Sequence, residues 1–288
     1  MILTLPAPAK LNLFLHITGR RDDGYHLLQT VFQLLDYGDE LTFSANCSGA
    51  INLINEIPGV ATKDNLIYRA AKALQSHSGT ARGADISFIK YLPSGGGLGG
   101  GSSDAATTLL GLNRLWGLAL SIDDLAAIGV NLGADVPVFV RGRSAWAEGV
   151  GEQLTAVQLP EHWYLVIFPG CTVNTGKIFS HRELTRNDVA ITIRAFLGAG
   201  GKNSCQPVTE KLYPAVAEAR KWLEKFAPTR MTGTGSCVYA RFASASEAGK
   251  VLEKLPGRWK GFVAKGVNVS PAHSALTESV YTGVSPSG

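Results

Sequence analysis

The sequence predicts a two-lobed α+β protein. Its 288 residues lie at the upper end for one hydrophobic core and are sufficient for two. Strand-like and helix-like segments alternate irregularly, which indicates mixed layers and not a regular parallel α/β sheet. A turn-rich stretch at 149–155 separates two independent sets of strands and helices. We therefore expect an N-terminal lobe of residues 1–153 and a C-terminal lobe of residues 154–288.

Seven segments have the length and apolar content of β-strands. In the first of them, residues 11–17, leucine and isoleucine alternate with other residues. If this segment is a strand, Lys10 and Asn12 point to the same face, because side chains alternate along a strand. The other six expected strands are residues 40–45, 85–91, 136–140, 164–168, 238–242 and 262–265.

Five segments have the signals of helices. Asp64 is a candidate cap for a helix over 65–75, whose apolar residues form one stripe. Ser121, with Asp124 three residues later, is typical of a capping box and predicts a helix to about residue 131. The remaining helices are expected from Ser103 or Asp104 to Trp116, along an apolar stripe from Leu212 to Phe226, and over 246–255.

Composition and charge exclude several classes of protein. The net charge of +4 comes without any block of five like charges, which suits an anionic small substrate and does not indicate nucleic acid. No apolar run reaches the roughly 18 residues that a membrane span needs, and the start MILTLPAPAK lacks the features of a signal peptide. The four cysteines form no CxxC pair. We expect a reduced, cytoplasmic protein without structural zinc; the oligomeric state is not indicated.

A glycine-rich loop is the strongest chemical signal. The stretch LPSGGGLGGGSSDAA, residues 92–106, places six glycines directly before a predicted helix. A helix N-terminus exposes free N–H groups and a partial positive charge. Glycines let the backbone approach a phosphate closely, and Ser102 and Ser103 add hydroxyl donors. The loop therefore predicts a phosphate-binding site.

Two other interpretations of this loop remain open on its residues alone. Gly95, Gly97 and Gly100 satisfy the dinucleotide fingerprint GxGxxG, and Asp123 follows 23 residues after the last glycine, near the expected acidic position. However, a loop with six glycines matches many spacings by chance. A Walker A loop is absent, with 170–177 a near miss. The loop could also be a mobile surface segment without a ligand.

Three ordered motifs resemble those of the GHMP kinases. They are PAPAKLNLFL (6–15), LPSGGGLGGGSSDAA (92–106) and MTGTGSCVYA (231–240). Three more stretches, 19–39, 132–152 and 261–271, resemble the branch of this family that acts on a cytidyl diphosphate substrate. The resemblance covers nearly the whole chain and is weakest from 176 to 207. It implies an N-terminal lobe like the second domain of ribosomal protein S5, a ferredoxin-like C-terminal lobe, and a substrate cleft between them.

The resemblance also implies a reaction. Members of this branch transfer the γ-phosphoryl group of ATP, with Mg²⁺, to the 2-hydroxyl of 4-diphosphocytidyl-2-C-methyl-D-erythritol on the non-mevalonate route to isoprenoid precursors. Asp135 matches the family's catalytic aspartate, which accepts the hydroxyl proton. Lys10 matches the catalytic lysine, whose ammonium stabilises the charged carboxylate. A homoserine or mevalonate kinase, or a non-catalytic relative, would be the alternatives; the second would be favoured by loss of Lys10 or Asp135, and both are present.

The same resemblance implies the binding residues. Tyr25 and His26 match the cytosine pocket, and Phe179 matches an aromatic residue that stacks on the base. Ser94 stands where a larger residue is expected in relatives, and the sequence names no carboxylate ligand for a metal. The substrate set is Asn12, Tyr25, His26, Phe32, Thr175 and Phe179. The ATP set is Asn65, Lys90, Pro93, Ser94, Gly95, Gly96, Gly97, Leu98, Gly99, Gly100, Gly101, Ser102 and Ser103.

Overall fold

The computed structural model describes residues 2–281 as a sheet flanked by helices. The strands are β1 (Ile2–Arg20), β2 (His26–Asn46), β3 (Ile51–Leu53), β4 (Gly83–Ile89), β5 (Ala145–Glu148), β6 (Gln153–Ala156), β7 (Trp163–Phe168), β8 (Thr229–Met231), β9 (Val238–Phe242) and β10 (Lys260–Val267). The helices are α1 (Leu66–Ser78), α2 (Gly100–Trp116), α3 (Ile122–Val130), α4 (Val136–Arg141), α5 (Thr175–Ser180), α6 (Ile193–Ala199), α7 (Gln206–Leu212), α8 (Pro214–Leu223), α9 (Ala245–Leu252) and α10 (Pro271–Tyr281), with a 3₁₀ turn η1 (Thr62–Asp64).

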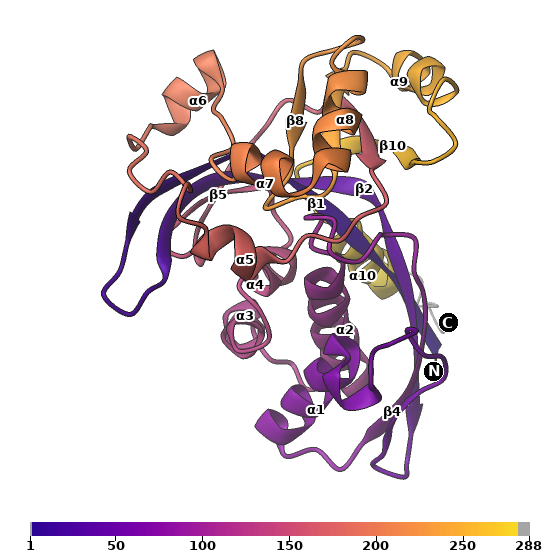
Figure 1. Ribbon diagram of the computed structural model, residues 1–288. Helices are drawn as coiled ribbons and strands as arrows, with labels where there is room; N and C mark the ends of the chain where they lie inside the picture. The colour runs from indigo at the N-terminus through magenta and orange to yellow at the C-terminus, as the bar shows by residue number, and fades with distance from the viewer. Residues whose placement is uncertain (1, 282–288) are drawn as a thin grey trace.

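A long antiparallel hairpin, β1 with β2, runs through both lobes. Its register extends from Ile2 opposite Ser44 to Arg20 opposite His26. In Figure 1 the hairpin arches between the C-terminal helices α7 and α8 and the N-terminal helices α1 and α2. The expected strand at 11–17 is the centre of β1, where side chains on both faces are buried. As expected, Lys10 and Asn12 share a face, and the Lys10 ammonium donates to Asn12 Oδ1 over 2.6 Å.

The N-terminal lobe packs helices against this hairpin and β4. β4 pairs with β2 antiparallel and with β3 in parallel, while β5 joins β2 to β6. The core includes Leu5, Phe43 and Leu109, which are fully buried, together with Trp116 of α2. Within this lobe, α2 is buried along most of its length. Its first turn, where the glycine loop ends, is therefore held rigidly against the sheet.

The C-terminal lobe has the predicted ferredoxin-like topology. Strands β7 to β10 form an antiparallel sheet in the order β10-β7-β9-β8. The chain visits it as strand, helices, two strands, helix and strand, which is the split βαβ arrangement. β10 also pairs with β2, through Gly266 opposite Leu35. The two sheets are therefore continuous, and the hairpin is a shared support for both lobes.

One expected strand is wrong. Residues 136–140 belong to the short helix α4, which has Pro137 in its first turn and ends at Gly142 with a positive φ of 63°. All five side chains from Val136 to Val140 are buried, so the segment is apolar on every side. Periodicity cannot distinguish a short, fully buried helix from a buried strand.

The expected helices differ from the observed ones mainly at their ends. Asn65, not Asp64, caps α1, because its side chain accepts from the Ile67 N–H. α2 begins at Gly100, earlier than Ser103 or Asp104. The stripe from 212 to 226 is divided between α7 and α8 at Tyr213. The capping box at Ser121 is confirmed, with Asp124 as its partner.

The last helix returns to the first lobe. Ala275 and Leu276 of α10 pack against the N-terminal core, and the His273 ring contacts the Val140 carbonyl of α4 at 2.9 Å. The N-terminal lobe also includes β6, through its pairing with β5. A division at residue 153 stays a prediction. No helix among residues 2–281 is long and apolar enough to span a membrane.

Candidate active site

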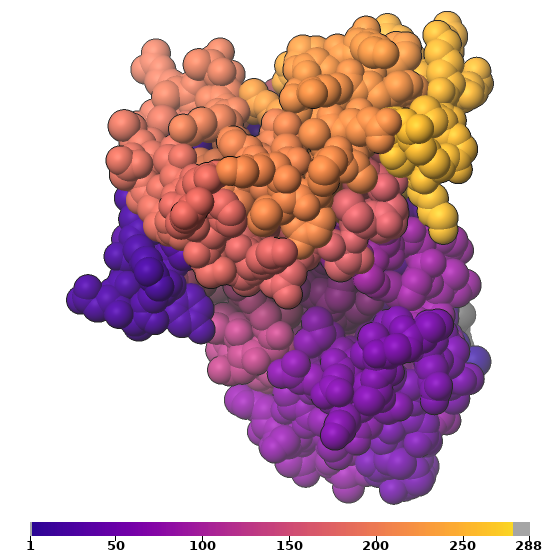
Figure 2. Space-filling model, in the orientation of Figure 1, coloured from indigo at the N-terminus to yellow at the C-terminus, as the bar shows by residue number. Residues whose placement is uncertain are grey.

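Two neighbouring cavities meet at the glycine loop: the larger lies between the lobes, and the smaller is lined by the N-terminal lobe alone. The larger has a volume of about 780 Å³ and the smaller about 340 Å³, and Gly97, Gly99 and Ser102 line both. In Figure 2 the surface is hollowed between the C-terminal lobe above and the N-terminal lobe below, beside the projecting tip of the β1–β2 hairpin. Two ligands bound in these cavities would therefore meet at the start of α2.

Backbone contacts fix the glycine loop in place. The Leu98 carbonyl accepts from the Lys10 N–H at 3.0 Å, and the Gly96 carbonyl accepts from the Cys237 N–H at 3.0 Å. Gly97 has a φ of +79°, and a Cβ there would lie 2.3 Å from the Thr232 carbonyl oxygen. Only glycine combines this backbone conformation with so close an approach. The MTGTG segment of 231–235 thus packs directly on the glycine loop.

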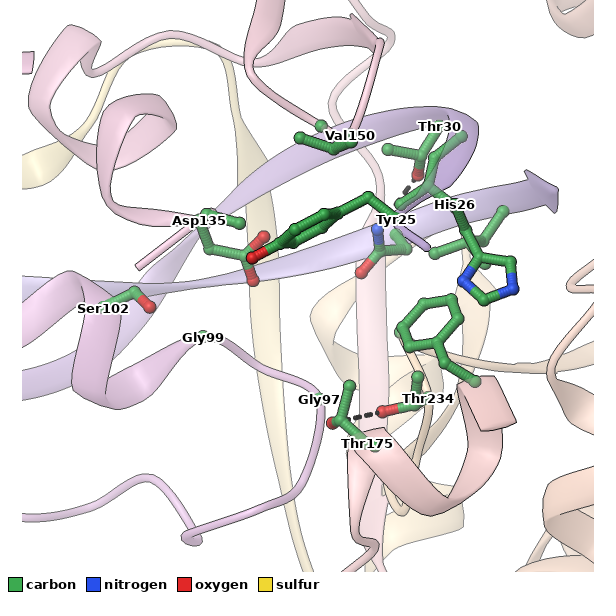
Figure 3. Close-up of a pocket in the computed structure, with 18 of the residues that line it drawn as sticks. Tyr25, His26, Thr30, Gly97, Gly99, Ser102, Asp135, Val150, Thr175 and Thr234 are labelled. Carbon is green, nitrogen blue, oxygen red and sulfur yellow. Dashed lines mark hydrogen bonds between the residues drawn. The ribbon is translucent and has the colours of Figure 1, made fainter. Parts of the chain in front are cut away.

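A lysine–aspartate pair stands at the junction of the cavities. The Lys10 ammonium lies 3.1 Å from Asp135 Oδ2 and 5.1 Å from the centre of the Phe32 ring. Lys10 is 3% exposed and is also fixed by Asn12. Asp135 stands directly before α4, and a third of its side chain is exposed. The Asp135 carboxylate therefore faces the larger cavity (Figure 3), while Lys10, its counter-ion, is buried.

Polar side chains beneath this pair form one connected network. The Asn12 amide group donates to Thr30 Oγ1 at 3.0 Å, and the Asn12 backbone N–H donates to Thr232 Oγ1 at 2.9 Å. Thr30 in turn donates to the Phe14 carbonyl. Every one of these groups is buried. The network orients Asn12 and, through it, the Lys10 ammonium.

Below the smaller cavity, Lys90 lies between two aspartates. Its ammonium contacts Asp39 Oδ2 and lies 2.5 Å from Asp104 Oδ2. Asp39 also accepts from the backbone N–H groups of Tyr91 and Leu92, at 2.6 and 2.8 Å. Burial raises the pKa of Asp104 to about 7, although the Lys90 charge opposes the shift. Burial disfavours the charge on Lys90, but Asp104 and Asp39 outweigh it and raise the pKa of this lysine.

Aromatic side chains gather at the far end of the larger cavity. The His26 and Phe179 rings stack with their centres 5.1 Å apart. Tyr25 is 64% exposed and projects into the cavity beside Asp135 and Val150 (Figure 3). Thr175, at the start of α5, hydrogen-bonds to Thr234 of the MTGTG segment at 2.9 Å. This end is built by the hairpin tip on one side and α5 on the other.

Comparison with known proteins identifies the family of this chain. A model of the GHMP kinases N terminal domain matches residues 65–143, and a model of the GHMP kinases C terminal domain matches residues 183–261. The chain belongs to the GHMP kinase family. It is 58% identical over 274 residues to a 4-diphosphocytidyl-2-C-methyl-D-erythritol kinase of Pseudomonas aeruginosa, covering 95% of this chain and 97% of that protein.

Two further relatives of this GHMP kinase agree. A protein of the same name from Nitrosococcus oceani is 54% identical over 269 residues, with 93% of this chain and 96% of the relative covered. A solved crystal structure of 4-(cytidine 5'-diphospho)-2C-methyl-D-erythritol kinase superposes with a TM-score of 0.83 at 33% identity, covering 92% of this chain and all of the other. The predicted family and fold are confirmed.

The GHMP kinase fold also rules out the dinucleotide fingerprint formed by Gly95, Gly97 and Gly100. The helix after the loop, α2, leads on to α3 and α4 and not to a parallel strand beside β4. The loop is also not an isolated surface segment, because it packs on the MTGTG segment and lines two cavities.

The structure gathers the predicted residues into two groups. The larger cavity is lined by Lys10, Asp135 and the whole predicted substrate set: Asn12, Tyr25, His26, Phe32, Thr175 and Phe179. The smaller is lined by Asn65, Lys90, Pro93, Ser94, Gly95, Gly96, Gly97, Leu98, Gly99, Gly100, Gly101 and Ser102. Ser103 is the exception, because it is fully buried in α2 and lines neither cavity.

Several residues around this GHMP kinase site were not predicted. Asp39 and Asp104 pair with Lys90, Thr30 supports Asn12, and Arg186 contacts His26. Asp104 and Thr30 lie inside two of the quoted motifs, where their burial under the site has no sequence signal of its own. Arg186 lies in 176–207, the stretch with the weakest resemblance.

Proposed function

We propose that this chain transfers the γ-phosphoryl group of ATP to the 2-hydroxyl of 4-diphosphocytidyl-2-C-methyl-D-erythritol. ATP would occupy the smaller cavity and the cytidyl substrate the larger one. Relatives of 54–58% identity, matched over nearly their full length, are named for this activity. Both reactants are small anions, so the reaction needs neither a membrane nor nucleic acid. We place it in the cytoplasm, on the route to isoprenoid precursors.

One observation carries the proposal: the Lys10–Asp135 pair stands where the two cavities meet. Phosphoryl transfer depends mainly on in-line positioning and on stabilisation of charge. Asp135 faces the larger cavity, where the acceptor hydroxyl would lie, and Gly97, Gly99 and Ser102 border both cavities. Donor phosphates on the loop and an acceptor beside Asp135 would therefore face each other across a short gap.

The proposed roles follow from the contacts of the two side chains. Asp135 would accept the proton of the attacking hydroxyl as a general base. The Lys10 ammonium, 3.1 Å away, would orient this carboxylate and counter negative charge at the reacting oxygens. Because Lys10 is anchored by Asn12 and Phe32, its charge needs no reorganisation during the reaction.

Mg²⁺ belongs to the proposal as a companion of the ATP phosphates. Among the described residues, no cluster of three or more His, Cys, Asp or Glu side chains forms a metal cage. This fits Mg²⁺, which is usually bound by one or two protein oxygens together with substrate phosphates. Ser102 and Asp135 line the same cavity and supply suitable oxygens. When bound, the ion would neutralise charge on the phosphates.

The end of the larger cavity that holds Tyr25, His26 and Phe179, here called the base end, favours this acceptor over the other substrates of the family. A mevalonate or homoserine kinase has no nucleobase to hold, whereas Tyr25, His26 and Phe179 offer rings at one end of a cavity of about 780 Å³. The test is an ADP-release assay with ATP, Mg²⁺ and the cytidyl substrate, with mevalonate and homoserine as rival acceptors. We expect turnover with the cytidyl substrate alone; turnover only with a rival acceptor would overturn the proposal.

A further inference from the structure

Arg186 forms hydrogen bonds to both sides of the base end: to His26 at the hairpin tip and to Phe179 of α5. It lies between α5 and α6 and is held between two buried neighbours, Leu184 and Asp188. Asp188 is tied to β1 at Ile17 by two hydrogen bonds of 2.9 Å, one through its carboxylate and one through its backbone N–H. These anchors place the Arg186 side chain against the hairpin tip, so its position is a fixed feature of the fold.

The Arg186 guanidinium donates four hydrogen bonds. Its Nη2 donates to the carbonyls of Phe179, at 3.0 Å, and His181, at 2.8 Å. Its Nη1 donates to the Leu184 carbonyl at 3.1 Å. These carbonyls lie at and just after the end of α5, where helix carbonyls lack partners and a cation is favourable. The fourth bond, from Nε to His26 Nε2, is 3.0 Å long.

This fourth bond determines the tautomer of His26. An arginine has only donors and stays protonated in proteins. His26 Nε2 must therefore accept, which leaves the proton of the neutral ring on Nδ1. Burial and the charges of Arg186 and Arg20 lower the pKa of His26, so the ring is neutral near pH 7. Among the described residues, Nδ1 has no hydrogen-bond partner, and it lies on the cavity side of the ring (Figure 3).

We propose that Arg186 is a positioning residue that sets base specificity, by holding His26 as a fixed N–H donor at the edge of the cavity. The inference rests on the proposed function. A cytosine ring presents acceptors at O2 and N3, whereas uracil carries a proton on N3. A fixed donor facing N3 matches the cytosine acceptor and opposes the uracil N3–H. If His26 could change tautomer, its Nδ1 would become an acceptor and would also fit uracil.

The first test measures the tautomer directly in the free protein. In ¹⁵N-labelled protein, the His26 imidazole resonances, assigned with His26→Gln, should show a protonated Nδ1 and an unprotonated Nε2. In Arg186→Met, which keeps the linear stem but removes every donor, a substantial Nε2–H population should appear. Arg182→Met, an exposed arginine in the same segment, is the matched control and should leave the spectrum unchanged. An unchanged His26 tautomer in Arg186→Met would overturn the proposal.

The second test measures specificity with the cytidyl substrate and its uridyl analogue. In Arg186→Met, we expect kcat/KM for the cytidyl substrate to fall about tenfold, the effect of one hydrogen bond to a desolvated partner. The preference over the uridyl analogue should fall by a similar factor, while KM for ATP stays unchanged. Arg186→Lys should not rescue it, because one ammonium cannot reproduce the four hydrogen bonds of the guanidinium.

The outcomes of the second test separate this inference from the proposed function. An equal loss with both nucleotides, accompanied by a higher KM for ATP, would mean that Arg186 only supports the fold. If the wild-type protein used neither cytidyl nor uridyl substrate, the proposed function would fail. The tautomer measurement would still decide what Arg186 does to His26, because it needs no substrate.

Discussion

The two ends of the larger cavity are built in different ways. The phosphate end is the part of the cavity formed by the glycine loop. There, backbone hydrogen bonds fix the structure: the Lys10 N–H donates to the Leu98 carbonyl, and the Cys237 N–H donates to the Gly96 carbonyl. At the base end, side chains on projecting elements do the work, since Tyr25 is mostly exposed and Phe179 is half-buried. The phosphate end is therefore set once the lobes fold. The base end depends on contacts across α5 and the hairpin tip.

This difference suggests a division of labour. In the proposed reaction, groups at the phosphate end would meet the reacting atoms, where small displacements are costly for chemistry. Groups at the base end would bind a part of the substrate that does not react, so their loss should affect mainly substrate affinity. Substitutions at the two ends should therefore separate effects on kcat from effects on KM.

The largest effect is expected at Asp135. Asp135→Asn keeps the size of the side chain and removes the proton acceptor, so kcat should fall by about 10²–10⁴-fold, the usual contribution of a general base. KM for the cytidyl substrate should change little, because the base end is intact. Steady-state kinetics and a binding titration check both values. Turnover near the wild-type level would show that Asp135 is not the general base. It would also contradict the assignment of effects on kcat to the phosphate end.

The next effect concerns the backbone of the loop. In Gly97→Ala, the new Cβ would lie 2.3 Å from the Thr232 carbonyl oxygen at a φ of +79°, so the loop must shift. We expect a loss of unfolding free energy of at least about 1 kcal/mol and a lower kcat. Thermal unfolding and kinetics measure both.

Gly249→Ala is the control for this loop substitution. It lies in α9 with open space around its Cβ and should be neutral or stabilising. If Gly97→Ala behaved like Gly249→Ala in both measurements, the loop would be far less constrained than its contacts indicate.

At the base end, Phe179→Ala should act on affinity. Loss of one stacking ring is worth roughly 1–3 kcal/mol, so KM for the cytidyl substrate should rise about 5- to 150-fold while kcat changes little. Phe226→Ala is the matched control, because Phe226 is also partly exposed and lines neither cavity. A fall in kcat with an unchanged KM would show that the two ends are not separable in this way.

The two ends also differ in how far the sequence predicts them. The phosphate end lies in contiguous motifs, so residues such as Lys10 and the loop glycines were expected at one site, and the structure places them there. The base end depends on contacts between distant segments. His26 and Arg186 are 160 positions apart, and no local pattern announces such a pair.

Burial limited the prediction in the same way elsewhere. Segment 136–140 was expected as a strand because all its residues are apolar, and only its packing on α2 and α3 makes it helical. Ser103 was expected at the loop as a donor, but α2 begins at Gly100, which turns this side chain into the core. Helix phase near a glycine run is set by tertiary contacts that local sequence does not encode.

The smallest effect tests the charges beneath the phosphate end. Burial raises the pKa of Asp104 to about 7, so between about pH 4 and pH 7 the folded state holds a proton that the unfolded chain releases. Stability contributed by this group therefore falls as pH rises through that window and is constant above it.

Asp104→Asn removes the titration. Between pH 6 and pH 8, its unfolding free energy should gain about 1–2 kcal/mol relative to wild type, as measured by urea unfolding. Asp22→Asn, at an exposed position, should show no such trend. A constant difference between Asp104→Asn and wild type would mean that Lys90 keeps Asp104 ionised throughout, and that the phosphate end rests on a fully charged triad.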